Sequence, residues 1–367
     1  MISQVELQKI ARNIIRKSMF VKEKEVVRIS TGPDAVNFAE MLAYESSIIG
    51  ANPTISYCST DLSLNIYRGT KLKYLKRIPK LSKYLAKNID VEIIIEDSNP
   101  FTEKKLPQEK VQARIKALKP LTKIRDRRVV KKTIKSALVG YPTKETANSL
   151  GTSFGKLNKI FWSTLNIDPY KLYLFNNNIV KRLRNADKIH ITGKRTNIEL
   201  SVKGREPIND CGLWEKEKTG YLNLPAGEVF YAPVETSANG EIYFDLPCLW
   251  HFGKQVKGVW FRFKNGKVID YSVEKGLKNF EDVMNNASGE KYRIAELGIG
   301  TNKNAKPTGG MTIVDEKIKG TIHMAIGMNK HFGGKNYATI HWDFFKDMKT
   351  GKMYVDGKPF MIKGKFV

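Results

Sequence analysis

The stretch EVVRISTGPDAVNFAEMLAYESSIIGANPTISYCS, residues 25–59, decides the fold of the first half of the chain. EVVRIS is a short β-prone run, TGPD supplies turn residues, and AVNFAEMLAYESSIIG has the apolar spacing of a helix that closes at Gly50. PTISYCS is again β-prone. The stretch therefore predicts one βαβ unit, and such units place helices over a parallel sheet through right-handed crossovers.

The sequence outside this unit predicts two domains of different character. VEIIIED at 91–97 adds a strand, after a Lys-rich helical stretch around 71–87 that Pro79 must kink or divide. Beyond about residue 186 short alternating strands follow one another, and FKNGKV carries an Asn265-Gly266 hairpin turn. We predict an open α/β sheet domain over residues 1–185 and a β-rich α+β domain, curled or barrel-like, over residues 186–367.

Length and composition fit this division. A chain of 367 residues with 41% hydrophobic and 10% aromatic residues is typical of two folded domains. No run approaches the roughly 20 apolar residues that cross a bilayer, which argues against a membrane protein. The first twenty residues have the spacing of a surface helix rather than of a signal peptide. The three cysteines are widely separated, which favours reduced thiols and a cytoplasmic protein.

The net charge of +26 raises the question of a polyanionic partner. The densest run, KALKPLTKIRDRRVVKK at 116–132, lacks the interleaved aromatic residues of a single-strand binding platform, and the chain has no recognisable nucleic-acid module. Lysines also occur along the whole chain. We therefore interpret the charge as a solvated Lys-rich surface and expect no nucleic-acid partner.

Three of the five histidines fall in one stretch, TIHMAIGMNKHFGGKNYATIHWDFF, at 321–345. His341 and Asp343 form an H-x-D pair that projects from one face if the segment is a strand. His323 lies on the preceding β-prone run and can reach the same place. A single histidine is more often a core or surface residue, but this clustering favours a site for zinc, manganese, iron or cobalt. His331 alone is better explained as a solvated loop residue.

Two glutamates upstream strengthen the metal hypothesis. Glu228 lies in LPAGEVFYAPVE and Glu296 in RIAELGIGTN, both otherwise apolar. A carboxylate in such a run is costly to bury unless it is paired or binds a metal. A salt bridge to one of the many lysines would explain either glutamate alone. Two such motifs beside the histidine cluster favour a shared metal site.

The motifs LPAGEVFYAPVE, AELGIGTN, GTIHMAIG and IHWDFF, in this order, resemble those of the thermophilic-type metalloaminopeptidases, the aminopeptidase T, aminopeptidase S and PepS family. The similarity covers essentially the whole chain. It implies a homodimer that removes N-terminal residues from peptides, with two divalent ions (Zn, Co or Mn) in each C-terminal domain. The ligands implied are Glu228, Glu296, His323, His341 and Asp343, with Glu296 as the bridging carboxylate.

The chain departs from the family pattern at one position. The pattern places a catalytic tyrosine seven residues after the first of these histidines, and Lys330 occupies that position here. If that tyrosine stabilises the tetrahedral intermediate, then His331, Lys330 or Tyr337 must replace it, or activity is reduced. Glu235, in the same motif as Glu228, is a candidate for the general base or for support of the ligands.

Two further functions stay open. A related branch resembles ring-cleaving dihydroxypyridine dioxygenases, in which His323, His341 and Asp343 would hold one ferrous ion. Such a centre would not need Glu228 and Glu296, so the sequence favours the peptidase. The other alternative is a catalytically weakened, basic binding protein.

Overall fold

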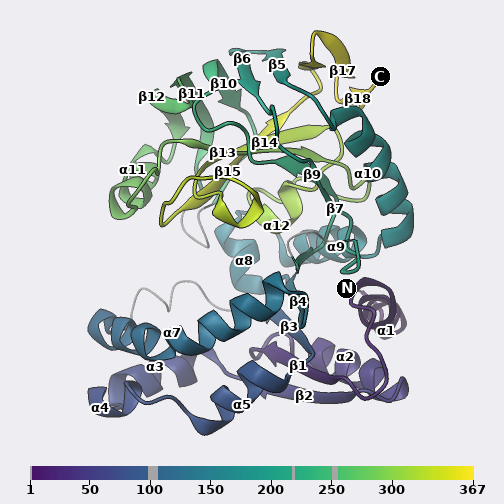
Figure 1. Ribbon diagram of the computed structural model, residues 1–367, viewed down its shortest axis with the longest axis vertical. Coiled ribbons are helices and arrows are strands. Elements are labelled where there is room, and N and C mark those ends of the chain that lie inside the picture. The colour runs from purple at the N-terminus through teal and green to yellow at the C-terminus, as the bar shows by residue number, and fades with distance from the viewer. Residues whose placement is uncertain (1, 98–105, 217–219, 250–254) are drawn as a thin grey trace. The chain divides into compact units, whose positions relative to one another are not determined.

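The computed structural model describes residues 2–97, 106–216, 220–249 and 255–367, which form two compact units (Figure 1). The first contains Met1–Thr146 and Gly212–Leu224, and the second contains Ala147–Cys211 and Pro225–Val367. This division differs from a boundary after residue 185. Residues 147–185 cluster with the second unit, and 212–224 returns to the first. Local sequence patterns do not show to which unit a segment belongs, because this depends on long-range packing.

A parallel five-stranded sheet forms the centre of the first unit, in the order β2-β1-β3-β4-β8. Its strands are β1 (Val26–Thr31), β2 (Asn52–Tyr57), β3 (Val91–Glu96), β4 (Lys135–Gly140) and β8 (Tyr221–Leu224). Strands β3 and β4 are largely buried on both faces, as expected for a parallel sheet between helices. The predicted α/β character of the N-terminal half is confirmed.

The helices of the first unit begin and end at recognisable signals. They are α1 (Gln4–Asn13), η1 (Ile14–Ser18), α2 (Val36–Ile48), α3 (Thr60–Gly69), α4 (Leu72–Leu75), α5 (Lys80–Asn88) and α7 (Gln108–Val130), with α8 (Lys144–Ser149) at its border. Ser3 and Glu6 form a capping box at the start of α1. Pro79 divides the Lys-rich stretch as predicted, because it precedes the first residue of α5. No helix within the described ranges combines the length and apolar composition needed to cross a bilayer.

Two antiparallel sheets make up the second unit. The eight-stranded sheet has the order β12-β11-β10-β6-β5-β16-β17-β18, and the five-stranded sheet has the order β15-β14-β13-β9-β7. The strands are β5 (Lys188–Gly193), β6 (Thr196–Ser201), β7 (Ile208–Asp210), β9 (Glu228–Tyr231), β10 (Asn239–Phe244), β11 (Lys257–Lys264), β12 (Lys267–Lys275), β13 (Ile294–Gly300), β14 (Thr321–Gly327), β15 (His341–Asp347), β16 (Lys352–Val355), β17 (Lys358–Ile362) and β18 (Lys365–Phe366). The helices are α9 (Phe154–Leu165), α10 (Pro169–Leu183), α11 (Leu277–Asn286), α12 (Thr312–Asp315) and the short η2 (Lys330–Phe332).

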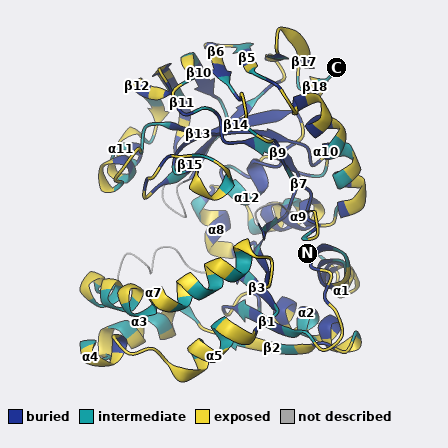
Figure 2. Ribbon diagram, in the orientation of Figure 1, coloured by how far each residue is buried: buried dark blue, intermediate teal, exposed yellow. Residues whose placement is uncertain are grey.

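Apolar side chains from both sheets and from α10 and α11 share one core. Phe261 of β11 and Phe344 of β15 meet edge to face with ring centroids 4.8 Å apart, and Phe280 of α11 packs beside them. The strands of the five-stranded sheet are mostly buried, whereas β12 at the edge of the eight-stranded sheet is largely exposed (Figure 2). The predicted β-rich character is confirmed, but the strands form two sheets around a common core rather than one curled sheet. The Asn265-Gly266 hairpin is also confirmed, since both residues have positive φ.

Candidate metal centre

The five-stranded sheet separates an apolar face from a charged face, because side chains alternate along each strand. The core face includes Val229, Leu297, Ile299, Ile322, Met324, Trp342 and Phe344. The opposite face carries Glu228 from β9, Glu296 from β13, His323 from β14, and His341 and Asp343 from β15. The structure thus brings together the five residues that the sequence indicated as ligands, although 115 residues separate Glu228 from Asp343.

Glu296 lies between the two histidines. Its Oε1 atom is 3.2 Å from Nε2 of His323, and its Oε2 atom is 3.3 Å from Nε2 of His341. On the far side of His323, Glu228 Oε2 lies 3.1 Å from the same Nε2 atom. On the far side of His341, Asp343 Oδ1 lies 3.6 Å from Nε2. One carboxylate oxygen of Glu296 therefore faces each imidazole.

The ligand atoms fall into two groups, and one contains a residue that the sequence did not indicate. Glu228, Glu316 and His323 form the first group, while Glu296, His341 and Asp343 form the second, each with its ligand atoms within 4.8 Å of one another. Glu316 follows α12 and is buried. The signal that could have revealed it is the charged triplet Asp-Glu-Lys between Val314 and Ile318, which burial of both apolar neighbours places inside the protein.

Lys317, the residue after Glu316, is a fully buried cation beside the first group. Its Nζ atom lies 2.7 Å from Asp210 Oδ2, 2.6 Å from Glu228 Oε1 and 2.9 Å from Glu316 Oε1. Asp210 and Glu228 face each other in the β7–β9 pairing, so the lysine binds two carboxylates that the strand pairing places side by side. Burial alone lowers the pKa of Lys317, but Asp210 and Glu228 outweigh it and raise the pKa well above its ordinary value. Lys317 therefore stays charged and occupies one oxygen of Glu228.

Burial and charge shift the pKa of the candidate ligands. Burial raises the pKa of Glu296, but hydrogen bonds from His323 and His341 outweigh it and lower the pKa to about 2. Burial lowers the pKa of both imidazoles, and the surrounding carboxylates reverse this and raise it well above 6.5. Burial raises the pKa of Glu316 to about 8 against the opposing effect of Lys317. Each of these buried charges is therefore compensated by the opposite charges around it.

The donor set fits a divalent cation. Oε2 of Glu228 and Oδ1 of Asp343 are buried, and neither accepts a hydrogen bond of good geometry from the described residues. Nδ1 of His341 lies 2.7 Å from the Met328 carbonyl oxygen, so an N–H there would turn Nε2 toward Glu296 and Asp343. Metal-binding histidines are commonly oriented by such a bond. Imidazole and carboxylate donors suit zinc, manganese, cobalt and ferrous iron.

Gly298 provides the space for the His323 ring. The two residues face each other in the β13–β14 pairing. A Cβ atom built on Gly298 would overlap Cε1 and Nε2 of the imidazole. The glycine in the AELGIGTN motif is therefore required by the close approach of the ring rather than by backbone conformation.

The remaining candidates from the sequence lie outside both groups of ligand atoms. Glu235 accepts from Arg205 at 2.6 Å and from the Lys335 backbone N–H at 2.6 Å, so it anchors the segment that follows β14. His331 is exposed on η2, and Tyr337 is 67% exposed. Lys330, at the position of the family tyrosine, has its Nζ atom 5.7 Å from the ring centroid of Tyr337.

An aromatic residue that the sequence did not indicate contacts the cluster. Phe332, the last residue of η2, packs edge-on against His341 with ring centroids 5.5 Å apart, and also against Phe230 at 5.5 Å. The η2 turn therefore presents an aromatic ring to the second ligand group, but one without a hydroxyl. The only signal in the sequence was its place between His331 and Gly333 in the connection between two ligand strands.

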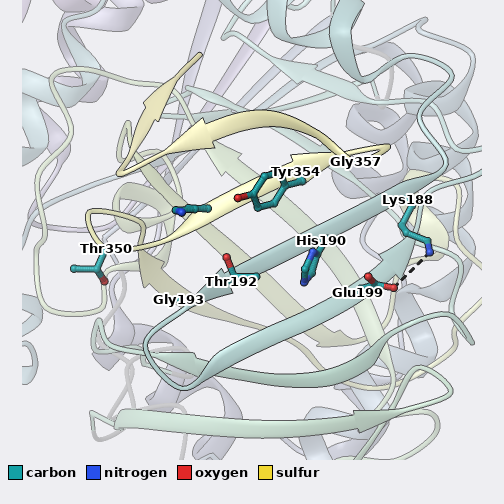
Figure 3. Close-up of a pocket in the computed structure, with 9 residues that line it drawn as sticks. Lys188, His190, Thr192, Gly193, Glu199, Thr350, Tyr354 and Gly357 are labelled. Atoms are coloured by element: carbon teal, nitrogen blue, oxygen red, sulfur yellow. Dashed lines mark ion pairs between the residues drawn. The ribbon is translucent and has the colours of Figure 1, made fainter.

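A cavity of about 580 Å³ lies over another sheet, on strands β5, β6 and β16 of the eight-stranded sheet. Figure 3 shows the side chains of His190 and Tyr354 beside each other there, and Lys188 pairs with Glu199 at the edge. The rings of His190 and Tyr354 stack with centroids 5.9 Å apart. None of the candidate metal ligands lines this cavity, so the chemistry argues for the carboxylate cluster as the functional site.

Comparisons with known proteins show to which proteins the whole chain is similar. Aminopeptidase PepS of Streptococcus thermophilus is 21% identical over 96% of this chain and 94% of its own length. Among solved structures, AmpT from Thermus thermophilus covers 99% of both chains with a TM-score of 0.78 at 20% identity. The 2,5-dihydroxypyridine dioxygenase of Pseudomonas putida KT2440 covers 100% of this chain and 98% of its own, with a TM-score of 0.63 at 14% identity.

At these identities the two structural similarities show the fold alone. The family match goes further, because residues 3–366 match the thermophilic metalloprotease (M29) family. The chain also contains two groups of histidines and carboxylates that could hold a metal ion. The chain therefore belongs to the thermophilic metalloprotease (M29) family of metalloaminopeptidases, hydrolases that act on peptide bonds.

Proposed function

We propose that this protein removes N-terminal residues from peptides at a centre of two divalent ions. The observation that carries the proposal is the position of Glu296, with one oxygen toward His323 and the other toward His341. A carboxylate in this position suits a bridge between two ions. Glu228 and His323 would hold one ion with Glu316 nearby, and His341 and Asp343 would hold the other.

The ions would supply Lewis acidity and a water molecule that is deprotonated near neutral pH. The residues of the chain prepare that chemistry. Lys317 holds Oε1 of Glu228, which leaves Oε2 directed at His323. The Met328 carbonyl fixes the His341 ring. Phe332 packs edge-on against that ring and would limit the access of bulk water to the cluster.

For the remaining candidates we propose separate roles. His331 lies in the η2 turn that contacts His341, and Tyr337 follows it, so either could donate a hydrogen bond to the tetrahedral intermediate. We propose that Glu235 positions this segment through its bond to the Lys335 backbone. The resemblance to the family further leads us to propose zinc, cobalt or manganese as the metal, and a homodimer, which light scattering of the purified protein would test.

Metal content and substrate cleavage test the proposed function together. After reconstitution of the full chain with zinc, cobalt or manganese, elemental analysis is expected to give about two ions per chain. A panel of fluorogenic aminoacyl substrates is expected to be cleaved with at least one of these metals. The contrary result is about one ferrous ion per chain with oxygen-dependent cleavage of 2,5-dihydroxypyridine. That outcome would favour the dioxygenase alternative, in which Glu228 and Glu296 have no ligand role.

Replacement of Gly298 by alanine is expected to disrupt the first ligand group. The added methyl lies 2.0 Å from Cε1 and Nε2 of His323, so the imidazole must move away from Gly298. A displacement of about 1 Å at a catalytic centre can lower the rate about 100-fold. Elemental analysis and kcat/KM of Gly298→Ala are the measurements.

Gly155→Ala is the matched control for this substitution. Gly155 lies in α9, and apart from its chain neighbours and the nearby backbone of its own helix no described atom is within 4 Å of its built Cβ. Because alanine is favoured over glycine in helices, this variant should keep its metal and be slightly more stable. Full metal content and activity in Gly298→Ala would contradict the assignment of His323.

A further inference from the structure

The helices α3, α4, α5 and α7 of the first unit carry a concentration of positive charge. Residues 60–88 and 108–132 are about one seventh of the chain. They contain eighteen of its 63 Lys and Arg residues but three of its 37 Asp and Glu residues, and therefore more than half of the net charge of +26. We call these two segments the basic helical layer. The charge is spread along the sequence, but the fold collects much of it in these packed helices.

Some of these cations hold the layer together. From α7, Lys110 donates to the Arg68 carbonyl at 2.8 Å, at the end of α3. Arg114 donates to the Arg77 carbonyl at 2.7 Å, in the turn after α4. Arg128 donates to the Ala86 carbonyl at 3.2 Å, near the end of α5. Cations at helix C-termini are stabilising, so α7 fixes the orientation of the three shorter helices.

The other basic side chains of the layer are mostly exposed (Figure 2). On α4 and α5 and the turn between them these are Lys73, Lys76, Arg77, Lys80, Lys83 and Lys87. Helix α5 has no buried residue, so each of its side chains is either exposed to solvent or only partly covered. The layer presents an open cationic surface whose geometry is set by α7.

Apolar side chains are exposed on the same helices. Eight of the twenty large apolar side chains that are exposed in the described residues belong to the basic helical layer. On α5, Leu81 is 68% exposed and Tyr84 is 63% exposed, within one turn of Lys80 and Lys83. Tyr74, also exposed, lies under the guanidinium of Arg77 at 4.7 Å from its ring centroid. Leu81 and Tyr84 are three positions apart on α5 and therefore lie on the same face of this helix.

We propose that the basic helical layer binds the surface of an anionic phospholipid membrane. Lysine and arginine side chains would contact the lipid phosphates, while Leu81 and Tyr84 would enter the boundary between headgroups and acyl chains. This mode of binding requires no helix that crosses the bilayer. It is independent of the proposed peptidase function, because every candidate metal ligand lies in the second unit.

Two other occupants fit the surface less well. A nucleic acid would be attracted by the same charge, but its phosphates would gain nothing from Leu81 or Ile78, which are also exposed. A second copy of this chain would bring two strongly cationic surfaces together, and like charges disfavour such contact. An anionic membrane accounts for both features of the surface, the exposed cations and the exposed aliphatic side chains.

Vesicle flotation with the full chain tests the proposal. The protein should float with phosphatidylcholine vesicles that contain about one third phosphatidylglycerol, remain unbound with pure phosphatidylcholine, and dissociate as salt is raised. The triple variant Lys80→Gln, Lys83→Gln, Lys87→Gln should bind about 100-fold more weakly, because one lysine near an anionic surface contributes about a fivefold change. The matched control is Lys264→Gln, Lys267→Gln, Lys275→Gln on the β11–β12 hairpin, which removes the same charge from other exposed positions.

A second variant separates membrane binding from polyanion binding. Leu81→Ser with Ile78→Ser should weaken vesicle binding about tenfold and leave retention on a labelled single-stranded RNA unchanged, because neither aliphatic side chain can stack on a base. Circular dichroism verifies that each variant is folded. The proposal is overturned if RNA binds and vesicles do not, if both vesicle types bind equally, or if the hairpin control loses as much affinity as the α5 variant.

Discussion

Glu296→Ala is expected to bind no more than about one divalent ion per chain and to lose about a thousandfold or more in kcat/KM. The substitution removes both oxygens that face His323 and His341, and with them the proposed bridge between the two ligand groups. Loss of metal stabilisation of a transition state amounts to several kcal/mol, which corresponds to this fall in rate. The histidines lose their charged partner and can become neutral, so the folded state should persist.

Elemental analysis after reconstitution and steady-state kinetics measure this effect. Glu235→Gln is the matched control, because Glu235 is also a buried glutamate of the second unit but bonds to Arg205 and Lys335. This control should retain both ions, and its activity reports the proposed positioning role. Two ions per chain in Glu296→Ala would exclude a bridging role for Glu296.

Lys317→Met is expected to lower the free energy of unfolding by about 3–5 kcal/mol, the usual effect of removing one partner from a buried ion pair. Lys317 is fully buried and lies within 2.9 Å of oxygens of Asp210, Glu228 and Glu316. Without the ammonium group three buried carboxylates would face one another. Urea denaturation of the metal-free protein, followed by circular dichroism, measures the change.

Lys346→Met is the matched control for this substitution. Lys346 is equally buried in the second unit, but its nearest carboxylate, Asp245 at 3.7 Å, is 32% exposed and can be hydrated. A loss of about 1 kcal/mol is therefore expected. Addition of Asp210→Asn and Glu316→Gln to Lys317→Met should restore part of the lost stability, because it removes two of the stranded charges. Equal losses for both lysines would show that general burial, not the carboxylate cage, explains the effect.

Periodicity predicted the architecture of this protein well where elements are local. The βαβ unit at 25–59, the division at Pro79 and the Asn265-Gly266 hairpin each depend on a few adjacent residues, and each is present. The position of β8 could not be predicted, because Tyr221–Leu224 completes a sheet whose other strands end by residue 140. Such long-range pairing is decided by which edges remain free after the local elements have formed.

The candidate site shows the same division. An acid in an apolar run and an H-x-D pair are visible in sequence, because burial of charge demands compensation. The roles of Glu316, Lys317, Asp210 and Phe332 are not visible there. Each becomes significant through a contact with a residue far away in the chain, such as Lys317 with Asp210 at 2.7 Å.

The sequence by itself determined the family, the α/β and β-rich halves, and which five residues are the candidate ligands, because motif order and side-chain alternation are properties of the chain. Only the tertiary structure decided that Glu296 lies between the two histidines and that a buried lysine neutralises the neighbouring carboxylates. It also decided that four helices rich in lysine and arginine pack together. Distances between side chains depend on strand register and helix packing, and these are set by the whole fold rather than by any one segment.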